Sequence, residues 1–433
     1  MLPGSTSLGD WGSQVQILSP RPFHLPLSSI QAMNARRALA FIFCTVLLDV
    51  LAMGLMIPVL PRIVLDFVDG DVAVAATMFG LMATVWGGLQ FLSSPLLGAL
   101  SDRYGRRLIL LFSCLGLGLD YVLMALAPTL TLLFIGRAVS GIAAATITTA
   151  FAYIADVTPA ENRARTYGIV GIAFGVGFVV GPAAGGLLGS VDVRLPLWLS
   201  AAACLANAAF GWFVLPESLP ADRRMAFDWR RANPIGSLRL LARHVQLAGL
   251  GAAGFLGQIA HQALPAVFVL YAAHRYGWSE LEVGLALGFV GLCSVIVQGL
   301  LIGPAVKTFG ERRTAVIGLL CGAVGMAIYG LAADGVQFGV GIVVMSLWGL
   351  TGPAVLAIMS RLVGPSEQGQ LHGANTALSS LAGLLAPGLF TLAFAHFVDT
   401  LPGAPFLLAA ATLLLAAVIA WATMWRRPGA PPP

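Results

Sequence analysis

The sequence predicts an all-α membrane protein whose twelve transmembrane helices form two six-helix pseudo-repeats. Three observations lead to this fold class. Of the 433 residues, 58% are hydrophobic and only 10% are charged, whereas about a quarter of an ordinary soluble domain is charged. Twelve apolar stretches are long enough to cross a bilayer, and landmarks of the first half recur at one spacing in the second half. Such a chain has too little polar surface to cover a soluble globule.

The same composition excludes several classes of protein. The five cysteines form no CxxC pair and all lie in apolar runs, which argues against a disulfide framework or a redox motif. The six histidines lack the HExxH spacing of a zinc site, and the chain contains no P-loop or GxSxG sequence. We therefore expect no enzyme activity, no cofactor, no resident metal ion and no nucleic-acid partner. The net charge of +5 is explained by loops at a membrane surface.

The N-terminal residues 1–33 are rich in Gly, Ser and Pro and lack the basic start and apolar core of a signal peptide. We expect a disordered leader here. Met33 begins a second possible start directly before Arg36, Arg37 and the first apolar run. This arrangement raises the hypothesis that the leader is an upstream extension of the reading frame, which N-terminal sequencing would test.

The rest of the chain alternates apolar stretches with short polar links. About 20 apolar residues at a rise of 1.5 Å cross a hydrocarbon core of roughly 30 Å. The longest polar segment, 216–245, is a linker that separates a bundle at 34–215 from a bundle at 246–427, with a tail at 428–433. The predicted spans lie near 38–60, 75–97, 108–127, 131–152, 166–189, 194–215, 246–272, 281–302, 314–333, 338–361, 371–397 and 402–425.

The basic residues predict the orientation in the membrane. Of the 24 lysines and arginines, nineteen lie on one side, in the even-numbered loops, the linker and both ends of the helical region. Positively charged loops near helix ends stay in the cytoplasm. We therefore expect a multi-pass protein of the cell membrane, the inner membrane in bacteria, with its termini and linker in the cytoplasm.

An internal duplication supports the division into halves. The segment from Gly98 to Arg107 is echoed by the segment that begins at Gly303, 205 residues later. Pro182 in the fifth span and Pro387 in the eleventh are also 205 residues apart. Several landmarks in one register indicate a two-repeat architecture, which many secondary transporters build around a central site.

The most specific motif lies between the second and third spans and consists of Gly98, Asp102, Gly105, Arg106 and Arg107. The glycines permit tight chain reversal and close backbone approach. The aspartate can cap a helix or pair with an arginine, and the arginines hold the loop in the cytoplasm. Such a cluster can act as a charge relay that latches a cytoplasmic gate. The alternative is a basic loop that only sets topology.

Three residues with formal charge lie deep inside predicted spans, namely Asp49, Asp120 and Arg137. Each costs roughly 2.5–3.5 kcal/mol inside a bilayer unless it faces a polar cavity or a partner. Burial favours the neutral form of a carboxyl group, which suits a proton-coupled carrier. We expect Asp49 and Asp120 to exchange protons and Arg137 to respond to their charge. The alternative is a structural pair between a carboxylate and Arg137.

The fifth span carries Gly181, Pro182 and Gly185. Small residues at four-residue spacing allow close helix approach, and proline removes one helix hydrogen bond. The pattern suits a hinge, and the alternative is generic helix packing.

The seventh span carries Gln258 and Gln262 one turn apart, with His261 beside them. Three polar groups so close together inside a membrane favour a cavity wall. His261 titrates near physiological pH and is a third candidate for proton exchange. A simple interhelical hydrogen bond is the alternative.

The loop motif, its weaker second copy and the six-plus-six plan resemble the major facilitator superfamily throughout residues 34–427. The resemblance is greatest to the drug–proton antiporter branch and, within it, to tetracycline efflux proteins. It implies the major facilitator fold, a hinge and seal in the fifth span, and substrate contacts at the two glutamines. It also implies a proton-coupled exporter whose partners are protons, the lipid bilayer and a small drug, free or as a metal complex. The segments that narrow the resemblance are Leu47–Pro61, Leu119–Tyr121, Gly136–Gly141 and Gly181–Gly186.

One position departs from that pattern. Tetracycline exporters carry a third buried aspartate in the ninth span, where this chain has Gly322. Tetracycline-type efflux is the leading hypothesis. The missing acid supports the competing hypothesis that the substrate is another amphipathic compound. Two alternatives stay open: an exporter of another drug, a sugar or a metabolite, and a non-transporting membrane sensor or assembly factor with a carrier fold.

Overall fold

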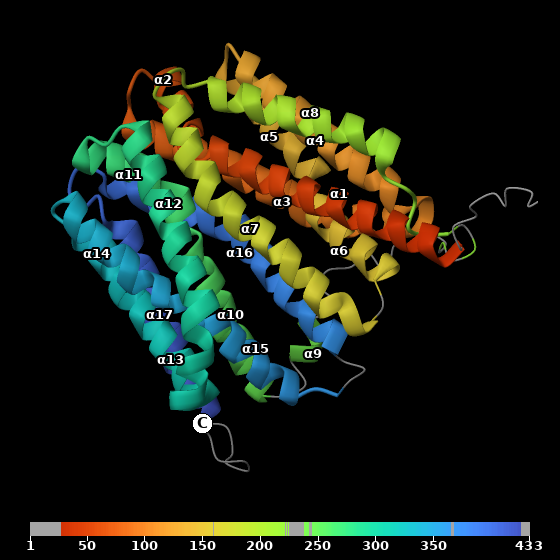
Figure 1. Ribbon diagram of the computed structural model, residues 1–433. Helices are drawn as coiled ribbons and strands as arrows, with labels where there is room; N and C mark the ends of the chain where they lie inside the picture. Colours follow the sequence, from red (N-terminus) through yellow and green to blue (C-terminus); the bar gives the residue numbers. More distant parts are fainter. Residues whose placement is uncertain are drawn as a thin grey trace, which may run out of the picture.

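The computed structural model describes residues 27–158, 160–220, 222, 224, 238–241, 245–364 and 368–425, and all regular structure in these ranges is helical (Figure 1). The first half contains α1 (Leu27–Met56), α2 (Leu60–Phe67), α3 (Val72–Tyr104), α4 (Arg106–Leu126), α5 (Leu130–Ala143), α6 (Thr146–Val157), α7 (Ala160–Gly189) and α8 (Leu195–Val214). The second half contains α9 (Leu238–Leu241), α10 (Val245–His261), α11 (Ala263–Tyr276), α12 (Glu280–Ile296), η2 (Val297–Leu301), α13 (Ile302–Leu331), α14 (Gly335–Ser346), η3 (Leu347–Leu350), α15 (Thr351–Arg361), α16 (Gln368–Phe397) and α17 (Ala404–Met424).

These helices make twelve membrane crossings. Eleven segments are long and apolar enough to span a bilayer, but one of them, Glu280–Leu331, has 52 residues. It would be roughly 78 Å long as a straight helix, far more than the hydrocarbon core of about 30 Å. Gly310 divides it with the non-helical angles φ 75° and ψ 161°. The segment therefore holds the eighth and ninth crossings, which confirms the predicted all-α fold of twelve spans.

Four of the crossings are interrupted, and the interruptions repeat between the halves. The first crossing breaks between α1 and α2 around Ile57, and the seventh breaks between α10 and α11 at Gln262, 205 residues later. The fourth crossing breaks between α5 and α6 at Ala144, and the tenth changes to the short 3₁₀ turn η3 at the corresponding place. Discontinuous helices mark the binding sites of many transporters, because their free backbone groups can face a polar cavity.

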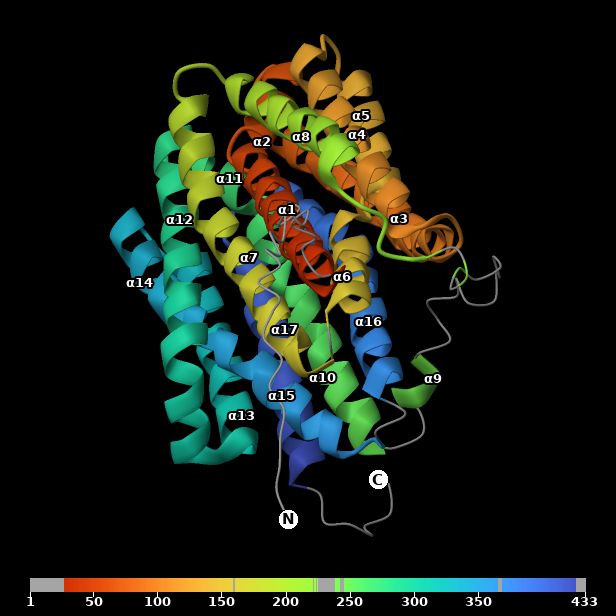
Figure 2. The same ribbon diagram turned by 45° about the vertical axis from the view of Figure 1, so that its right-hand side comes forward.

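The helix pairs also repeat. In the first half α1 packs against α7 and α4 packs against α8, while in the second half α10 packs against α16 and α13 packs against α17. The two halves meet along α7 with α12 and along α3 with α16. Figures 1 and 2 show the helices converging near α2 and α11 and fanning apart toward the far ends of α3 and α13.

Glycines bring the helix backbones together at these seams. A Cβ atom on Gly181 would lie 2.8 Å from Gly54 Cα on α1, and one on Gly186 would lie 3.0 Å from Gly284 Cα on α12. On the other seam, a Cβ atom on Gly87 of α3 would lie 2.8 Å from the carbonyl oxygen of Gly383 on α16. Small residues therefore allow α7 to pack closely against α1 of its own half and against α12 of the other half.

The predicted leader and linker fall largely outside the described residues. Residues 1–26 are not described, whereas α1 already begins at Leu27, inside the segment for which we expected disorder. Of the linker, the described part is 216–220, Asp222, Arg224 and 238–241, together with the start of α10 at Val245.

Gly185 and Gly171 on α7 allow a matched test of the glycine seam. A Cβ atom on Gly185 would lie 2.8 Å from Leu55 Cα, whereas one on Gly171 would meet nothing within 4 Å. Because overpacking costs about 1–3 kcal/mol, Gly185→Val should lower the thermal unfolding temperature of the detergent-solubilised protein by several degrees. Gly171→Val, with the same change in helix propensity, should leave it nearly unchanged, and equal shifts would contradict the packing account.

Candidate functional site

A buried ion pair lies inside the N-terminal half. Asp120 on α4 is fully buried and Arg137 on α5 is 8% exposed; Arg137 Nη1 lies 3.5 Å from Asp120 Oδ2. The same nitrogen donates to the Met56 sulfur at 3.3 Å, and the guanidinium lies 5.2 Å from the ring centre of Trp86 on α3. Gly136 leaves room for the carboxylate, because a Cβ atom there would lie 2.9 Å from Asp120 Oδ1.

The ion pair is loose for a buried one. Charge-assisted N–H···O bonds are usually about 2.7–2.9 Å long, so the 3.5 Å contact is long, and the other polar side chain beside the Asp120 carboxylate is Ser140. A buried charge without full hydrogen bonding is costly, and a carboxylate relieves this cost by binding a proton. With this geometry, Asp120 can bind a proton in place of its contact with Arg137.

Asp49, the second expected acid, lies on α1 and is 9% exposed. Its neighbour is Thr146, the first residue of α6 after the break in the fourth crossing. Asp49 and Asp120 thus both lie in the N-terminal half, close to the interrupted helices.

The loop between α3 and α4 forms a dense polar network. Arg106 contacts Asp102 Oδ1 at 2.5 Å and Asp156 Oδ2 at 3.1 Å. The Glu217 carboxylate accepts hydrogen bonds from the backbone N–H groups of Arg106 and Arg107 at 2.8 and 3.3 Å. It thereby caps the N-terminus of α4, a role we had considered for Asp102.

The two glycines of this loop behave differently. Gly105 has φ 104°, and a Cβ atom there would lie 2.6 Å from Glu217 Cδ, so only glycine fits this turn. Gly98 lies inside α3, and a Cβ atom there would meet nothing within 4 Å. The expectation of a close backbone approach at Gly98 is therefore wrong.

The contacts described for this loop cluster lie within the N-terminal bundle and the adjoining start of the linker, where Glu217 lies. Its second copy has the same backbone turn with inverted charges. Gly310 repeats the positive φ of Gly105, and Glu311 pairs with Arg361 just as Arg106 pairs with Asp156. Each corresponding residue lies 205 positions later. The inverted positions are Asp102 and Lys307, Arg106 and Glu311, and Asp156 and Arg361.

The three polar residues of the seventh crossing lie at its interruption. Gln258 and His261 are exposed and Gln262 is partly buried. The His261 ring lies 5.6 Å from the Trp348 ring, centre to centre. A Cβ atom on Gly383 would lie 3.2 Å from Gln262 Nε2, which places the glutamine beside the seam between α3 and α16.

Trp348 explains why position 322 is a glycine. A Cβ atom on Gly322 would lie 2.9 Å from Trp348 Cγ and 3.2 Å from Leu413 Cδ1. The indole fills the space that a side chain at position 322 would need, and it faces His261. Sequence reasoning assigned no tryptophan to the site, since nothing in the pattern separated Trp348 from packing aromatics.

Gly181, Pro182 and Gly185 lie on α7 at the seams described above. Pro182 lies inside the helix, and a Cβ atom on Gly54 of α1 would come within 2.9 Å of its Cδ. The close packing expected of these residues is thus visible on α7. Within the described residues, no three His, Cys, Asp or Glu side chains gather as metal ligands.

Comparison with known proteins identifies relatives of the whole fold. The profile of the Major Facilitator Superfamily matches residues 42–387 and, in a second match, 250–433. The chain is 37% identical to the class C tetracycline resistance protein of Escherichia coli over 88% of this chain and 96% of that protein. It is 32% identical to the class E tetracycline resistance protein of Escherichia coli over 88% and 93% of the two chains.

A solved structure of a bacterial homolog of the human lysosomal transporter Spinster, inward-facing and unoccupied, has the same fold. Its TM-score is 0.73 at 15% identity, over 90% of this chain and 97% of that one. The human organic anion transporter MFSD10 (TETRAN) gives a TM-score of 0.67 at 23% identity, over 89% and 99%.

The ion pair between Asp120 and Arg137 can be tested by a double-mutant cycle. Arg137→Ala should destabilise the protein by about 3–5 kcal/mol, because it leaves a carboxylate buried without its partner. Adding Asp120→Asn should recover at least about 1 kcal/mol of that loss. Unfolding of the solubilised single and double variants measures the coupling, and strictly additive effects would show that the two groups do not interact.

Proposed function

The chain belongs to the major facilitator superfamily, and we propose that it is a proton-coupled exporter of drug-like amphipathic compounds, with tetracycline-type efflux as its leading activity. The observation that carries this proposal is the loosely paired Asp120 with Arg137, together with Asp49, beside interrupted helices inside a membrane protein. The similarity to tetracycline resistance proteins over most of both chains supports the substrate class.

Export requires access from the cytoplasm, and the fold supports this direction. The helices diverge toward the ends that carry the basic loops (Figure 2), and such loops stay in the cytoplasm. In the proposed orientation the helices are spread apart on the cytoplasmic side, and we infer that the α7–α12 and α3–α16 seams close the outer side. We propose that the protein lies in the cell membrane, the inner membrane in bacteria, and takes its substrate from inside.

Proton coupling follows from the buried charges. When the site faces outward, a proton binds Asp120, cancels its attraction to Arg137 and lets the guanidinium move away from the carboxyl group. When the site faces inward, release of that proton restores the pair. Asp49 beside Thr146 supplies a second proton-exchanging carboxyl group, and His261 supplies a third group in the other half.

The two halves are linked by a short chain of contacts. Trp86 adjoins Gly87, which packs against Gly383, and Gly383 approaches Gln262. A displacement of Arg137 therefore has a packed route to the glutamine of the other half. In this mechanism Gly181, Pro182 and Gly185 act as hinge and seal. The network of Gly98, Asp102, Gly105, Arg106 and Arg107 acts as a charge relay that stabilises the cytoplasmic gate.

The substrate contacts are proposed at Gln258, Gln262, His261 and Trp348. Amides can donate and accept hydrogen bonds, while the indole and the imidazole offer flat faces to an aromatic compound. A specific observation favours a second candidate substrate. Position 322 is a glycine in place of the acid that the resemblance implies, and Trp348 fills the space beside it. The site therefore suits planar amphipathic drugs that are not cationic metal complexes.

Drug resistance in an efflux-deficient host tests the proposed function. The wild-type protein should raise the minimum inhibitory concentration of at least one tetracycline, and Asp49→Asn should abolish the increase because it removes a proton-exchanging group. Asp66→Asn, at an acid whose side chain is 56% exposed, is the matched control and should keep resistance. Resistance that survives Asn substitution of both Asp49 and Asp120 would contradict proton coupling, and no resistance to any compound would favour a sensor or assembly factor.

Substrate choice tests the role of Trp348. Trp348→Ala should change the drug profile several-fold, with planar aromatic compounds losing most, since stacking contributes roughly 0.5–1.5 kcal/mol per ring pair. Gly322→Asp alone should impair export of every substrate because the new side chain collides with the indole, and combination with Trp348→Ala should restore export to the level of Trp348→Ala alone. Transport by everted vesicles measures both effects, and a Gly322→Asp variant with unaltered transport would refute this account.

A further inference from the structure

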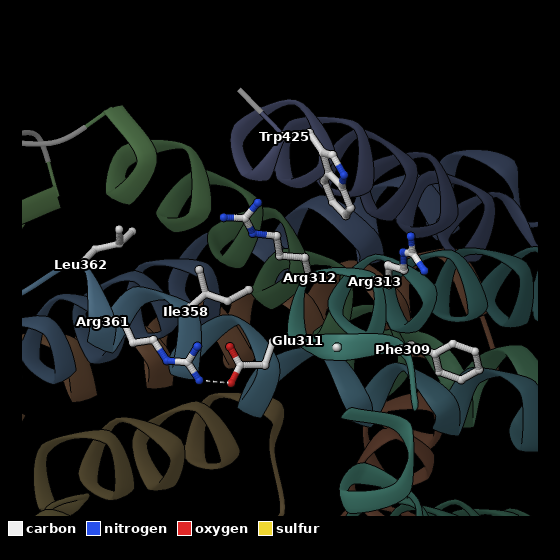
Figure 3. A pocket seen from close by; sticks show the side chains of 9 residues that line it. Phe309, Glu311, Arg312, Arg313, Ile358, Arg361, Leu362 and Trp425 are labelled. Carbon is white, nitrogen blue, oxygen red and sulfur yellow. Dashed lines mark hydrogen bonds and ion pairs between the residues drawn. The ribbon is translucent and has the colours of Figure 1, made fainter. Parts of the chain in front are cut away.

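A basic pocket lies at the end of the C-terminal half where the eighth and ninth crossings turn. It has a volume of about 450 Å³ and is bounded by the turn at Gly310, the end of α15 and the end of α17. Figure 3 shows the side chains of Glu311, Arg312, Arg361 and Trp425 arranged around it. No step of the proposed transport cycle uses this pocket.

The charge of the pocket is strongly positive. Three arginines line it, and Glu311, the single acid among its lining residues, is paired with Arg361. Arg312 and Arg313 are exposed and have no ionic partner among the described residues. The sequence after Trp425 continues with two more arginines and contains no acid. Among the residues that the structure describes, the carboxylates at this pocket are therefore too few to balance its charge.

The pseudo-equivalent position in the N-terminal half shows what is missing. There the Glu217 carboxylate fills the turn at Gly105 and accepts hydrogen bonds from the backbone N–H groups of Arg106 and Arg107. The corresponding residues, 205 positions later, are Gly310, Glu311 and Arg312, and all three line the pocket. Glu217 follows the last helix of its half, α8, whereas α17 is followed by arginines. An anion from outside the chain would complete the second turn as Glu217 completes the first.

We propose that this pocket binds the phosphate headgroup of an anionic phospholipid. Guanidinium groups pair with phosphate oxygens in bidentate fashion. The rim favours a lipid over a soluble phosphate, because Phe309 is 49% exposed and Trp425 is 38% exposed at the helix ends. Aromatic side chains at this depth anchor proteins at the membrane interface, and basic pockets between helices on the cytoplasmic side bind anionic headgroups.

Binding of fluorescent phosphatidylglycerol to the purified full-length protein tests this proposal without reference to any transported substrate. The wild-type protein should bind phosphatidylglycerol at least tenfold more tightly than phosphatidylcholine carrying the same label. The double variant Arg312→Gln with Arg313→Gln should lose roughly tenfold or more of that affinity, since each arginine near an anionic lipid contributes about fivefold. Arg275→Gln, an exposed arginine at the opposite membrane end, is the matched control and should bind as the wild type does.

Two further measurements keep the outcome decisive. Raising the salt concentration should weaken phosphatidylglycerol binding to the wild-type protein. This measurement needs no variant, so it stays informative if the double variant folds poorly. At constant ionic strength, displacement of the labelled lipid by millimolar inorganic phosphate would show a soluble anion site and overturn the lipid assignment. Equal binding of the two lipids, or an unchanged affinity of the double variant, would overturn the proposal altogether. Loss of drug export with intact lipid binding would count against the transport function alone.

Discussion

The ion pair between Asp120 and Arg137 is the constraint around which the N-terminal half is arranged. Two charges inside a bilayer are tolerated only with partners or water, and here the partners are minimal: a 3.5 Å contact, a methionine sulfur and the face of an indole. Gly136 leaves room for the carboxylate. In the proposed mechanism the long contact lets the pair respond to a proton, which a closely hydrogen-bonded pair could not do at a comparable cost.

Movement of such a site between two faces requires seams that can slide without a barrier of interlocked side chains. The glycines of α7, α12, α3 and α16 provide backbone contact in place of side-chain interdigitation. The two-fold repeat supplies matching interruptions in the first, fourth, seventh and tenth crossings. Its two copies differ in charge. Arg106 pairs with Asp156 in the first copy, and Glu311 pairs with Arg361 in the second, so the ion pair is present in both with the charges reversed.

Much of this architecture follows from the sequence alone. Span length and basic loops give the twelve crossings, and a shared offset of 205 gives the repeat. The buried ionisable residues stand out because membranes exclude them. Contacts between distant segments leave no such signal. Glu217 caps α4 from 111 residues away, and Trp348 meets Gly322 across helices. Gly98 illustrates the opposite error, because a motif glycine lies inside a helix with open space beside it.

The most direct measurement of the central claim is proton release on drug binding. Purified protein in weakly buffered detergent solution, mixed with a transported drug, should release protons that a pH indicator detects. The Asp120→Asn variant should bind the drug and release fewer protons per drug molecule than the wild-type protein, because its site carries no exchangeable proton at that position. Drug binding to the wild-type protein without any proton release would contradict the account.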